Sequence, residues 1–257
     1  MKHKIVAGVT TKNEDWIIEK TLKALDKFCD KIIVYDDGST DNTENISKSF
    51  NKVSWVVRPN HNEFIREEAR QRLELINLIK NTDADYALLL DADEIPTPSI
   101  IPFIENINDA TSWKIKMINL WGDETQYRCD AFTTRFGTNV NWDPFTPTSW
   151  SKYPLFKFDK NYEYTYELNV QKGGCSNYHP APSNLSGNIS STDDFYVMHY
   201  GPLSEFYLSG KKHEFYSKIE EMDGKGSFDE RMNWHREHAN LNNVQTRPTN
   251  KDWFWNF

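Results

Sequence analysis

Long apolar runs and an excess of positive charge are both missing from this sequence of 257 residues. Because no run of about 18 apolar residues occurs, we expect no transmembrane helix. The charged start Met1–Lys4 leads directly into a predicted strand, so we expect no signal peptide. The chain has 30 Lys and Arg against 38 Asp and Glu, a formal net charge of −8. Nucleic-acid binding needs positive charge opposite the phosphates, so we expect no nucleic-acid partner.

Cysteine is scarce as well. The three cysteines, Cys29, Cys129 and Cys175, are odd in number, widely spaced and never arranged as CxxC. This predicts free thiols instead of a disulfide framework, and with the missing signal peptide it predicts a cytoplasmic protein. Glycine is absent from the Thr-Thr-Lys-Asn-Glu loop after the first predicted strand, which argues against the glycine-rich phosphate loop of sugar nucleotidyltransferases.

What the sequence does contain is a regular alternation of strand and helix patterns. Apolar runs predict strands over 5–10, 31–35, 53–57 and 86–90, and apolar residues at helical spacing between them predict three helices. Strands joined in this way form a parallel sheet with right-handed crossovers. Beyond a predicted turn at 95–98 the pattern is less regular. Helices are expected over 99–106 and 203–222, and strands over 113–120, 153–158 and 195–199.

Acidic clusters end two of these strands. The fourth strand ends in Asp-Ala-Asp-Glu at 91–94, and the second ends in Asp-Asp-Gly-Ser-Thr-Asp at 36–41. Ligands of open α/β sheets bind at the carboxyl ends of the strands. Asp91 and Asp93 are two residues apart, so on a strand they would point in the same direction. Two convergent carboxylates suit Mg²⁺ or Mn²⁺, with positions left for water and phosphate. A plain solvated strand end is the alternative.

Three motifs in order resemble the signatures of family 2 glycosyltransferases with the GT-A fold. They are Val-Thr-Thr-Lys-Asn-Glu at 9–14, Ile-Val-Tyr-Asp-Asp-Gly-Ser-Thr-Asp-Asn-Thr at 33–43 and Leu-Asp-Ala-Asp-Glu at 90–94. The resemblance covers roughly residues 4–104. It returns at 198–201, Met-His-Tyr-Gly, in a pattern similar to the lipopolysaccharide-core type of the family.

The resemblance implies a GT-A (Rossmann-like) fold of the α/β class, with a mostly parallel central sheet and helices on both faces. It also implies a single domain over 1–257. The nucleotide-sugar-binding half would be 1–120, and the acceptor-side half, which carries a C-terminal helix, would be 121–257.

The activity implied by the resemblance is metal-dependent, inverting glycosyl transfer. The donor would be a nucleoside-diphosphate sugar, with UDP as the expected nucleotide, and the acceptor a hydroxyl of a glycan, a lipid or another molecule. Mn²⁺ or Mg²⁺ would offset the negative charge that builds on the diphosphate as the glycosidic bond breaks. The alternative is a catalytically inactive carbohydrate- or nucleotide-binding protein, whose sugar stacking the nine Trp and twelve Tyr would suit.

Several residues match donor-binding positions of the family. These are Thr10, Asn13, Glu14, Asp37, Arg70, Asp91 and Ala92. Asp37 would accept a hydrogen bond from a pyrimidine N–H, Arg70 would lie near the donor, and Asp91 would reach the ribose or a metal-bound water. Helix capping is the alternative role for Asp37, and a solvated helix cation is the alternative for Arg70.

The resemblance also implies a metal site. Its predicted ligands are Asp91, Asp93 and His199, because carboxylate oxygens and an imidazole nitrogen suit Mn²⁺. Lys211 and Lys212, on the helix after His199, would meet the diphosphate, with a solvated helix face as the alternative for at least one of them.

An inverting enzyme needs a base that takes the proton of the acceptor hydroxyl. Here the chain departs from the family, since the usual acidic pair is not recognisable and Pro180 follows His179 where related enzymes have His-Glu. By chain order the predicted base is Glu167 or His179. Asp123 and Glu124, in the loop after Trp121, are the alternatives.

Overall fold

The computed structural model describes residues 3–58, 68–133, 139–166, 181–185, 187–222, 224, 226–238 and 244–257. The elements of its first part are β1 (Ile5–Thr11), α1 (Ile18–Asp26), β2 (Lys31–Asp36), α2 (Thr43–Lys48), β3 (Val53–Val57), α3 (Glu68–Ile79), β4 (Tyr86–Asp91), β5 (Glu94–Pro96) and α4 (Ile100–Glu105). The strands of its second part are β6 (Ser112–Trp121), β7 (Asp123–Arg128), β8 (Ala131–Thr133), β9 (Asn139–Asn141), β10 (Ser151–Lys157), β11 (Ile189–His199) and β12 (Thr246–Pro248). The helices there are η2 (Gly201–Leu203), α5 (Glu205–Leu208), α6 (Lys211–Met222), α7 (Phe228–His238) and η3 (Lys251–Trp253).

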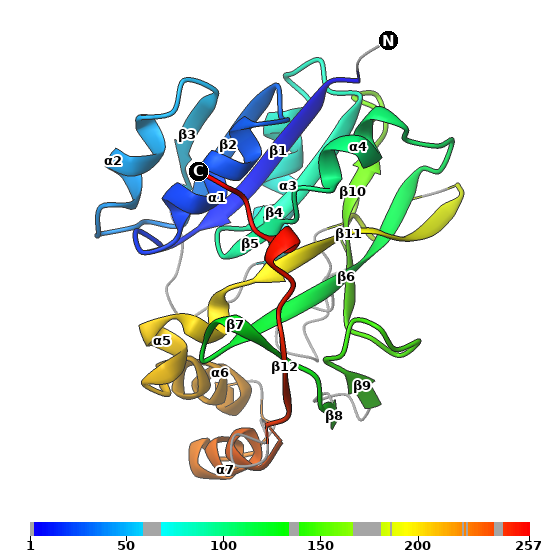
Figure 1. Ribbon diagram of the computed structural model, residues 1–257. Helices are drawn as coiled ribbons and strands as arrows, with labels where there is room; N and C mark the ends of the chain where they lie inside the picture. The colour runs from blue at the N-terminus through cyan, green and yellow to red at the C-terminus, as the bar shows by residue number, and fades with distance from the viewer. Residues whose placement is uncertain are drawn as a thin grey trace.

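One large sheet runs through both halves of the molecule (Figure 1). Its strand order is β12-β7-β6-β10-β4-β1-β2-β3, and β11 pairs with β5 and β6 beside this path. The strands β4, β1, β2 and β3 are parallel, and so are β11 and β6, whereas β10 runs antiparallel to both β4 and β6. The predicted α/β class with a mostly parallel sheet is therefore confirmed.

The strands β1, β2 and β4 are buried on both faces, which explains why they read as continuous apolar runs. Alternate residues of β1 point to opposite sides: Ile5, Ala7 and Val9 pack in one cluster with α1, and Val6 packs in another with α3. A side chain at Gly8 would meet Leu75 of α3 at 2.9 Å, so glycine lets this helix approach the sheet closely. Each fully buried Leu or Ile contributes roughly 1.5–3 kcal/mol to stability.

Helices therefore cover both faces of the parallel part. The cluster beside α1 also takes up residues of α2 and α4, and α3 covers the opposite face. Far from these, α5, α6 and α7 gather at the end of the molecule opposite the amino terminus (Figure 1). The division into a half at 1–120 and a half at 121–257 stays a prediction.

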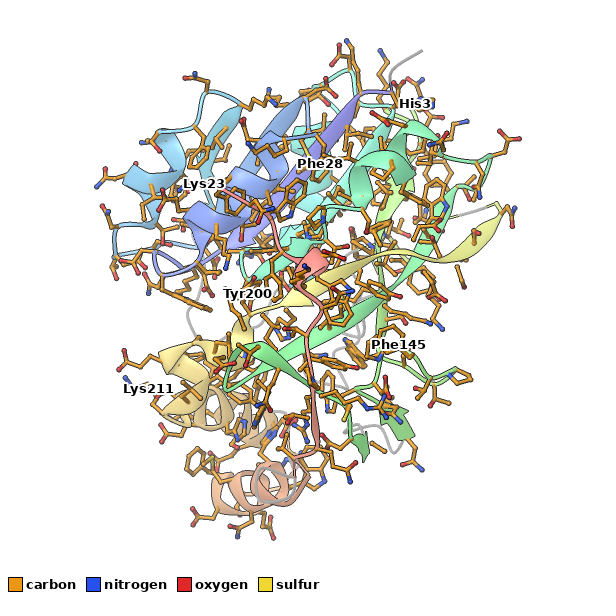
Figure 2. All side chains as sticks on the ribbon, viewed as in Figure 1. His3, Lys23, Phe28, Phe145, Tyr200 and Lys211 are labelled. Atoms are coloured by element: carbon orange, nitrogen blue, oxygen red, sulfur yellow. The ribbon has the colours of Figure 1, made fainter. Side chains whose placement is uncertain are left out.

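The C-terminal segment returns to the first part of the fold. The strand β12 pairs with β7, and beyond it Trp255 stacks on Phe28, whose place Figure 2 shows, at 6.2 Å between ring centroids. The Trp255 Nε1–H donates a hydrogen bond to the Pro96 carbonyl at 2.7 Å. The last residues thus pack against the apolar core beside the site described below.

Two sequence expectations beyond residue 94 were wrong. The predicted turn at 95–98 contains the short strand β5, because Glu94–Pro96 pairs with β11 and this partner lies about a hundred residues away in sequence. The single helix predicted over 203–222 is split, since Gly210 has φ +80 and so ends one helix before α6 begins. The helix α7 and the strands β7, β8, β9 and β12 were not predicted.

Candidate active site

The carboxyl ends of β1, β2 and β4 lie side by side at one edge of the parallel sheet. The register pairs Thr10 with Asp91 and Thr11 with Asp36. Because neighbouring parallel strands end at the same edge, the three motifs of the sequence meet there, where ligands of open α/β sheets bind.

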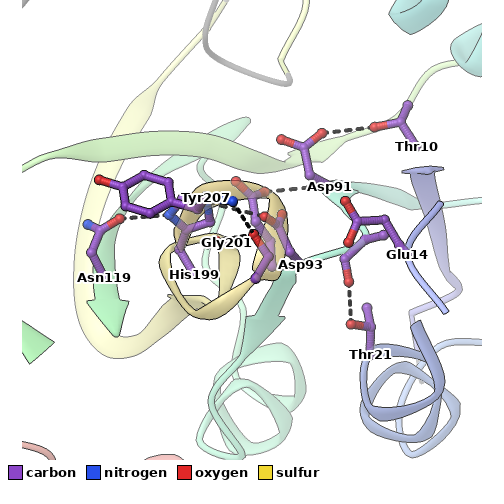
Figure 3. Close-up of polar contacts among 12 residues, drawn as sticks. Thr10, Glu14, Thr21, Asp91, Asp93, Asn119, His199, Gly201 and Tyr207 are labelled. Atoms are coloured by element: carbon purple, nitrogen blue, oxygen red, sulfur yellow. Dashed lines mark hydrogen bonds and ion pairs between the residues drawn. The ribbon is translucent and has the colours of Figure 1, made fainter. Parts of the chain in front are cut away.

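Asp91, the last residue of β4, contacts cations with both of its oxygens, and Figure 3 shows its hydrogen bond with Thr10. Its Oδ1 accepts a hydrogen bond from Thr10 Oγ1 at 2.8 Å and pairs with Arg72 of α3, and its Oδ2 lies 3.5 Å from Lys152 Nζ. Burial alone would raise the pKa of Asp91, but Arg72 and Lys152 outweigh it and hold that pKa well below its usual range. Asp91 is therefore ionised at neutral pH.

Lys152 also belongs to the site, and the sequence analysis did not identify it. It comes from β10 and pairs with Glu94, which is 1 % exposed and whose Oε2 accepts a hydrogen bond from the Asp91 N–H at 3.2 Å. Burial would lower the pKa of Lys152, but the carboxylates of Glu94 and Asp91 raise it, so the lysine stays charged. The sequence offers only one hint, since a glutamate in a buried strand needs a cation but chain order does not say which.

The sequence analysis also missed Arg72 and named Arg70 instead as the helix cation near the donor. The Arg70 side chain is 59 % exposed and its Nε lies 2.9 Å from Glu74 Oε1. Arg72 shares the buried face of α3 with Leu75 and Ile79, at helical spacing. This helical spacing is the feature of the sequence that could have identified Arg72. The donor role of Arg70 stays a prediction, but Arg72 is the helix cation that contacts Asp91.

Asp93 and His199 form the second pair of facing side chains in the site (Figure 3). The expectation that Asp91 and Asp93 share a strand was wrong: β4 ends at Asp91, and Asp93 lies in the turn before β5. The His199 Nε2 is 3.4 Å from Asp93 Oδ2. Burial would raise the pKa of Asp93, but His199 and Lys212 lower it more strongly. His199 ends β11, which pairs with β5 and so carries the ring to this turn.

Gly201 keeps the space beside this pair open. A Cβ at position 201 would lie 2.6 Å from both Asp93 Oδ2 and His199 Nε2. Two ligands bound at neighbouring positions of one octahedral ion would be about 3 Å apart, so these two atoms fit a shared Mn²⁺ or Mg²⁺. Among the described residues, no group of three or more His, Cys, Asp or Glu side chains is arranged to hold a metal. If Asp93 and His199 hold an ion, its other coordination positions would be available to phosphate and water.

Asp91 is less suited than Asp93 to direct metal ligation. Both of its oxygens are engaged by Thr10, Arg72 and Lys152, whereas the Asp93 oxygen faces a histidine nitrogen beside an open space. The geometry therefore favours Asp93 and His199 among the three predicted ligands.

Glu14 brings a third carboxyl group to the site from the loop after β1. In Figure 3, Asp93 lies between His199 and Glu14. Burial, and then the negative charge of Asp93, raise the pKa of Glu14 to about 8, although its Oε2 accepts a hydrogen bond from Trp16 Nε1 at 2.7 Å. Glu14 and Asp91 therefore differ in protonation at neutral pH: Glu14 binds a proton and Asp91 does not.

Asp37 has the exposure and the partners of a ligand-facing residue. The preceding Asp36 is 2 % exposed and turns inward, where it accepts hydrogen bonds from the Gly38 and Ser39 N–H groups. Asp37 lies 3.1 Å from Arg58 Nη1 and 4.0 Å from Lys12 Nζ. The capping alternative for Asp37 has no support, because the carboxylate at the start of α2 is that of a different residue, Asp41, which accepts from the Thr43 N–H at 3.0 Å.

Asn13 joins the loops that follow β1 and β2. It has φ 55, a left-handed conformation that asparagine tolerates better than most residues. Its Oδ1 accepts from the Thr40 N–H at 2.7 Å, and its own N–H donates to Ser39 Oγ at 2.8 Å. These contacts hold the shape of the site, and the donor-binding role of Asn13 stays a prediction.

Ala92 lies in the core beneath the site and is 2 % exposed. Its N–H donates to the Thr10 carbonyl at 3.0 Å, and its carbonyl accepts from Thr21 Oγ1 at 2.5 Å. The hydrogen bonds of Ala92 thus support the loop. Its side chain is buried and does not reach the surface where the predicted nucleotide-sugar donor would bind.

The two lysines at the start of α6 point in different directions. Lys211 is exposed at the outer edge of the molecule (Figure 2). Lys212 is half-buried with its Nζ 5.5 Å from the centre of the Tyr207 ring. Burial would lower the pKa of Lys212, but Tyr216, Asp93 and other groups raise it. Lys212 therefore supplies positive charge next to the carboxylates of the site.

The predicted bases Glu167 and His179 lie outside the described residues. Of the alternatives, Asp123 is exposed on β7 and accepts from the Thr125 N–H at 2.7 Å, and Glu124 pairs with Lys20 of α1. The identity of the base stays a prediction.

The sequence profile of a known family, described as glycosyl transferase family 2, matches residues 7–179. This stretch covers more than half of the chain and includes all three motifs. The chain belongs to glycosyl transferase family 2. The predicted family is thus confirmed. A search of curated proteins finds no significant match to the chain.

Solved structures of glucosyl-3-phosphoglycerate synthase from Mycobacterium tuberculosis are similar to this family 2 chain. The complex with Mn²⁺, UDP and phosphoglyceric acid is 21 % identical with a TM-score of 0.36, and the match covers 48 % of this chain and 45 % of that one. The complex with Mg²⁺ and UDP is 22 % identical with a TM-score of 0.36, covering 46 % and 44 %. The chain spans less than half the length of that enzyme in these matches.

No helix in the described part of this family 2 chain is both long enough and apolar enough to cross a membrane. The cytoplasmic location stays a prediction.

Proposed function

We propose that the protein transfers a sugar from a nucleoside-diphosphate sugar to a hydroxyl group of a glycan, lipid or other acceptor, with a divalent metal ion and with inversion at the anomeric carbon. The observation that carries this proposal is the Asp93–His199 pair, which faces an open space kept free by Gly201 in a family 2 chain. The resemblance of residues 198–201 to the lipopolysaccharide-core type suggests a glycan acceptor.

In this proposal Asp93 Oδ2 and His199 Nε2 hold Mn²⁺ or Mg²⁺. The ion, when bound, offsets the charge of the departing nucleoside diphosphate. Lys212 adds positive charge on the same side, because its interaction with Asp93 places it close to the metal-facing carboxylate. Asp91, fixed by Thr10 and Lys152, presents an ionised carboxylate toward the ribose or a metal-bound water.

The nucleobase would be read by Asp37. An ionised carboxylate accepts hydrogen bonds but cannot donate one, so it suits the ring N–H of uracil. Arg58, which is 6 % exposed, holds Asp37 Oδ1 at 3.1 Å and so fixes the direction of the carboxylate. This supports UDP as the nucleotide of the donor.

Inversion requires a base on the acceptor side. Glu167 and His179 remain the proposed candidates, with Asp123 and Glu124 as alternatives. A non-catalytic sugar- or nucleotide-binding protein is the second candidate function, and the nine Trp of the chain are its motivation. Nucleoside diphosphate released from a UDP-sugar in the presence of acceptor glycans would distinguish the enzyme from the binding protein.

The direct test is a thermal-shift experiment with UDP, GDP and CDP, each with Mn²⁺ and with EDTA. A ligand that binds the folded state raises the melting temperature. We expect UDP with Mn²⁺ to give the largest shift and UDP with EDTA a much smaller one. Equal shifts under both conditions would contradict the metal dependence, and a larger shift with GDP would contradict the choice of uridine.

A further inference from the structure

Asn119 lies directly behind His199, on the side away from the open space. It belongs to β6, which runs parallel to β11, and the register pairs Asn119 with His199. Asn119 is 2 % exposed, and its Oδ1 is 2.7 Å from His199 Nδ1 (Figure 3). Because both residues sit inside paired strands, their contact is fixed by the sheet itself.

The two nitrogens of the His199 ring have partners at different distances. The 2.7 Å contact with Asn119 lies within hydrogen-bonding range, and the 3.4 Å separation of Nε2 from Asp93 Oδ2 exceeds the usual 2.7–3.2 Å for an N–H···O bond. A carbonyl oxygen can only accept, so Nδ1 carries the hydrogen. In the neutral ring Nε2 then presents a lone pair to the space beside Asp93.

We infer that Asn119 is a positioning residue, which holds His199 in the Nδ1–H tautomer so that Nε2 can share a divalent metal ion with Asp93. This inference rests on the proposed metal-dependent function. Histidines that bind metals commonly donate their other ring N–H to a fixed acceptor, and loss of that acceptor typically weakens metal affinity about 10–100-fold. Here the acceptor is supplied by the strand next to that of the ligand.

The amide of Asn119 is only partly satisfied, and this agrees with a functional role. Its Nδ2 is buried and has no hydrogen-bond partner among the described residues. A buried donor without a partner destabilises the fold by roughly 1–3 kcal/mol, and a side chain kept only for packing would not carry this cost. Holding the histidine is the role of Asn119 that requires its oxygen.

Two substitutions separate positioning from plain packing. Asn119→Asp keeps an acceptor oxygen but buries a charge, whereas Asn119→Leu removes the acceptor and keeps the volume. If Asn119 only packs, the Leu variant should be at least as good as the Asp variant in every assay. If it positions His199, the Leu variant should fold and yet bind Mn²⁺ more weakly than the Asp variant does.

The first measurement is a titration with Mn²⁺ in the presence of UDP, with free Mn²⁺ followed by electron paramagnetic resonance. We expect Asn119→Leu to lose about 10–100-fold in Mn²⁺ affinity, and Asn119→Asp to stay within a few-fold of the wild type. Ser112→Ala is the matched control, because Ser112 is another buried polar residue of β6 and pairs with Ile189, at the other end of β11 from His199. Equal affinities for the wild type and Asn119→Leu would overturn the inference.

The second measurement needs no metal. Nitrogen-15 NMR at alkaline pH, where histidines are ordinarily neutral, reports which ring nitrogen carries the hydrogen. The His199 signal is assigned by its absence from His199→Gln. We expect the Nδ1–H tautomer in the wild type and in Asn119→Asp. In Asn119→Leu the hydrogen should move to Nε2, since Asp93 is then the acceptor beside the ring among the described contacts.

The two measurements also separate the failure of the inference from the failure of the proposed function. An Nε2–H tautomer in the metal-free wild type overturns the positioning role, whatever the metal does. If the wild type binds no Mn²⁺ with UDP, metal dependence fails together with the role of Asn119 in it. Wild-type Mn²⁺ binding that Asn119→Leu retains in full overturns the inference alone and leaves the metal-dependent function standing.

Discussion

The two parts of the sheet place their site residues differently. In the parallel part, Thr10, Asp37 and Asp91 lie at or just beyond the ends of β1, β2 and β4, where the apolar run of each strand stops. In the second part, Asn119 and Lys152 lie within β6 and β10, among core residues. Residues at strand ends approach the ligand through loops, and residues within strands support them from behind.

The two parts therefore have different roles in the site. The strand-end carboxylates face solvent and are available to a donor, whereas Lys152 and Asn119 each orient a residue of the site, namely Asp91 and His199. Burial makes these orienting contacts strong, because an unsatisfied partner left in the interior would be costly. Substitutions in the first part should therefore change ligand binding, and those in the second part should change geometry.

The largest effect is expected from Asp93→Ala, at the junction of the two parts. It removes one of the two proposed metal ligands, so Mn²⁺ affinity in the presence of UDP should fall by at least about 100-fold. The fold should survive, because Asp93 lies in a turn at the sheet edge. A thermal-shift titration measures both the Mn²⁺ affinity and the melting temperature of the variant. The control is Asp123→Ala, an exposed carboxylate outside the metal pair. If Mn²⁺ stabilised Asp93→Ala with UDP as strongly as it stabilises the wild type, the metal would have to bind elsewhere in the protein.

The next effect tests a strand end of the parallel part. Asp37→Asn keeps the size of the side chain but can present a donor where only an acceptor fits. UDP affinity should fall by about 1.5–3 kcal/mol, the range for a hydrogen bond to a charged group. Calorimetric titration measures the change, and Glu44→Gln, on the exposed face of α2, is the control. Unfolding of Asp37→Asn instead would show that the residue is structural.

A smaller effect is expected at α6, in the second part. Lys212→Ala removes a half-buried charge next to Asp93, and UDP affinity should fall by about 1 kcal/mol in the presence of Mn²⁺. Lys211→Ala, its exposed neighbour, should change affinity very little, and the loss in Lys212→Ala should shrink at high salt. Equal losses in both variants would mean that α6 acts only through its overall charge.

The last prediction concerns stability within one pH range. The pKa of Glu14 is raised from 4.5 to about 8 in the folded protein, so above pH 4.5 the unfolded chain loses this proton before the folded one does. The free energy of unfolding of the wild type should therefore fall, relative to that of Glu14→Gln, as pH rises from 4.5 to about 8, and then level off. Urea unfolding at several pH values measures the difference. If the difference in free energy of unfolding between the wild type and Glu14→Gln did not change with pH, the pKa of Glu14 would not be raised by folding.

The success of the sequence predictions follows the same division. The strands predicted at 31–35 and 86–90 were placed within one residue, because a strand buried on both faces has an apolar pattern of its own. The acidic motifs were found because they interrupt such runs. Arg72 and Lys152 were missed, since a cation that is buried by its neighbours looks like any surface cation in the sequence.

The sequence by itself determined which segments form the parallel strands, the family and the carboxylates that end β2 and β4, because each of these depends on residues close together in the chain. Only the tertiary structure decided that Asp93 leaves the strand of Asp91, that Arg72 and Lys152 hold Asp91, and that Asn119 stands behind His199. These contacts join residues that are 19 to 80 positions apart. They arise from helix packing and strand register, which depend on the free energy of the whole core and leave no local periodicity to detect.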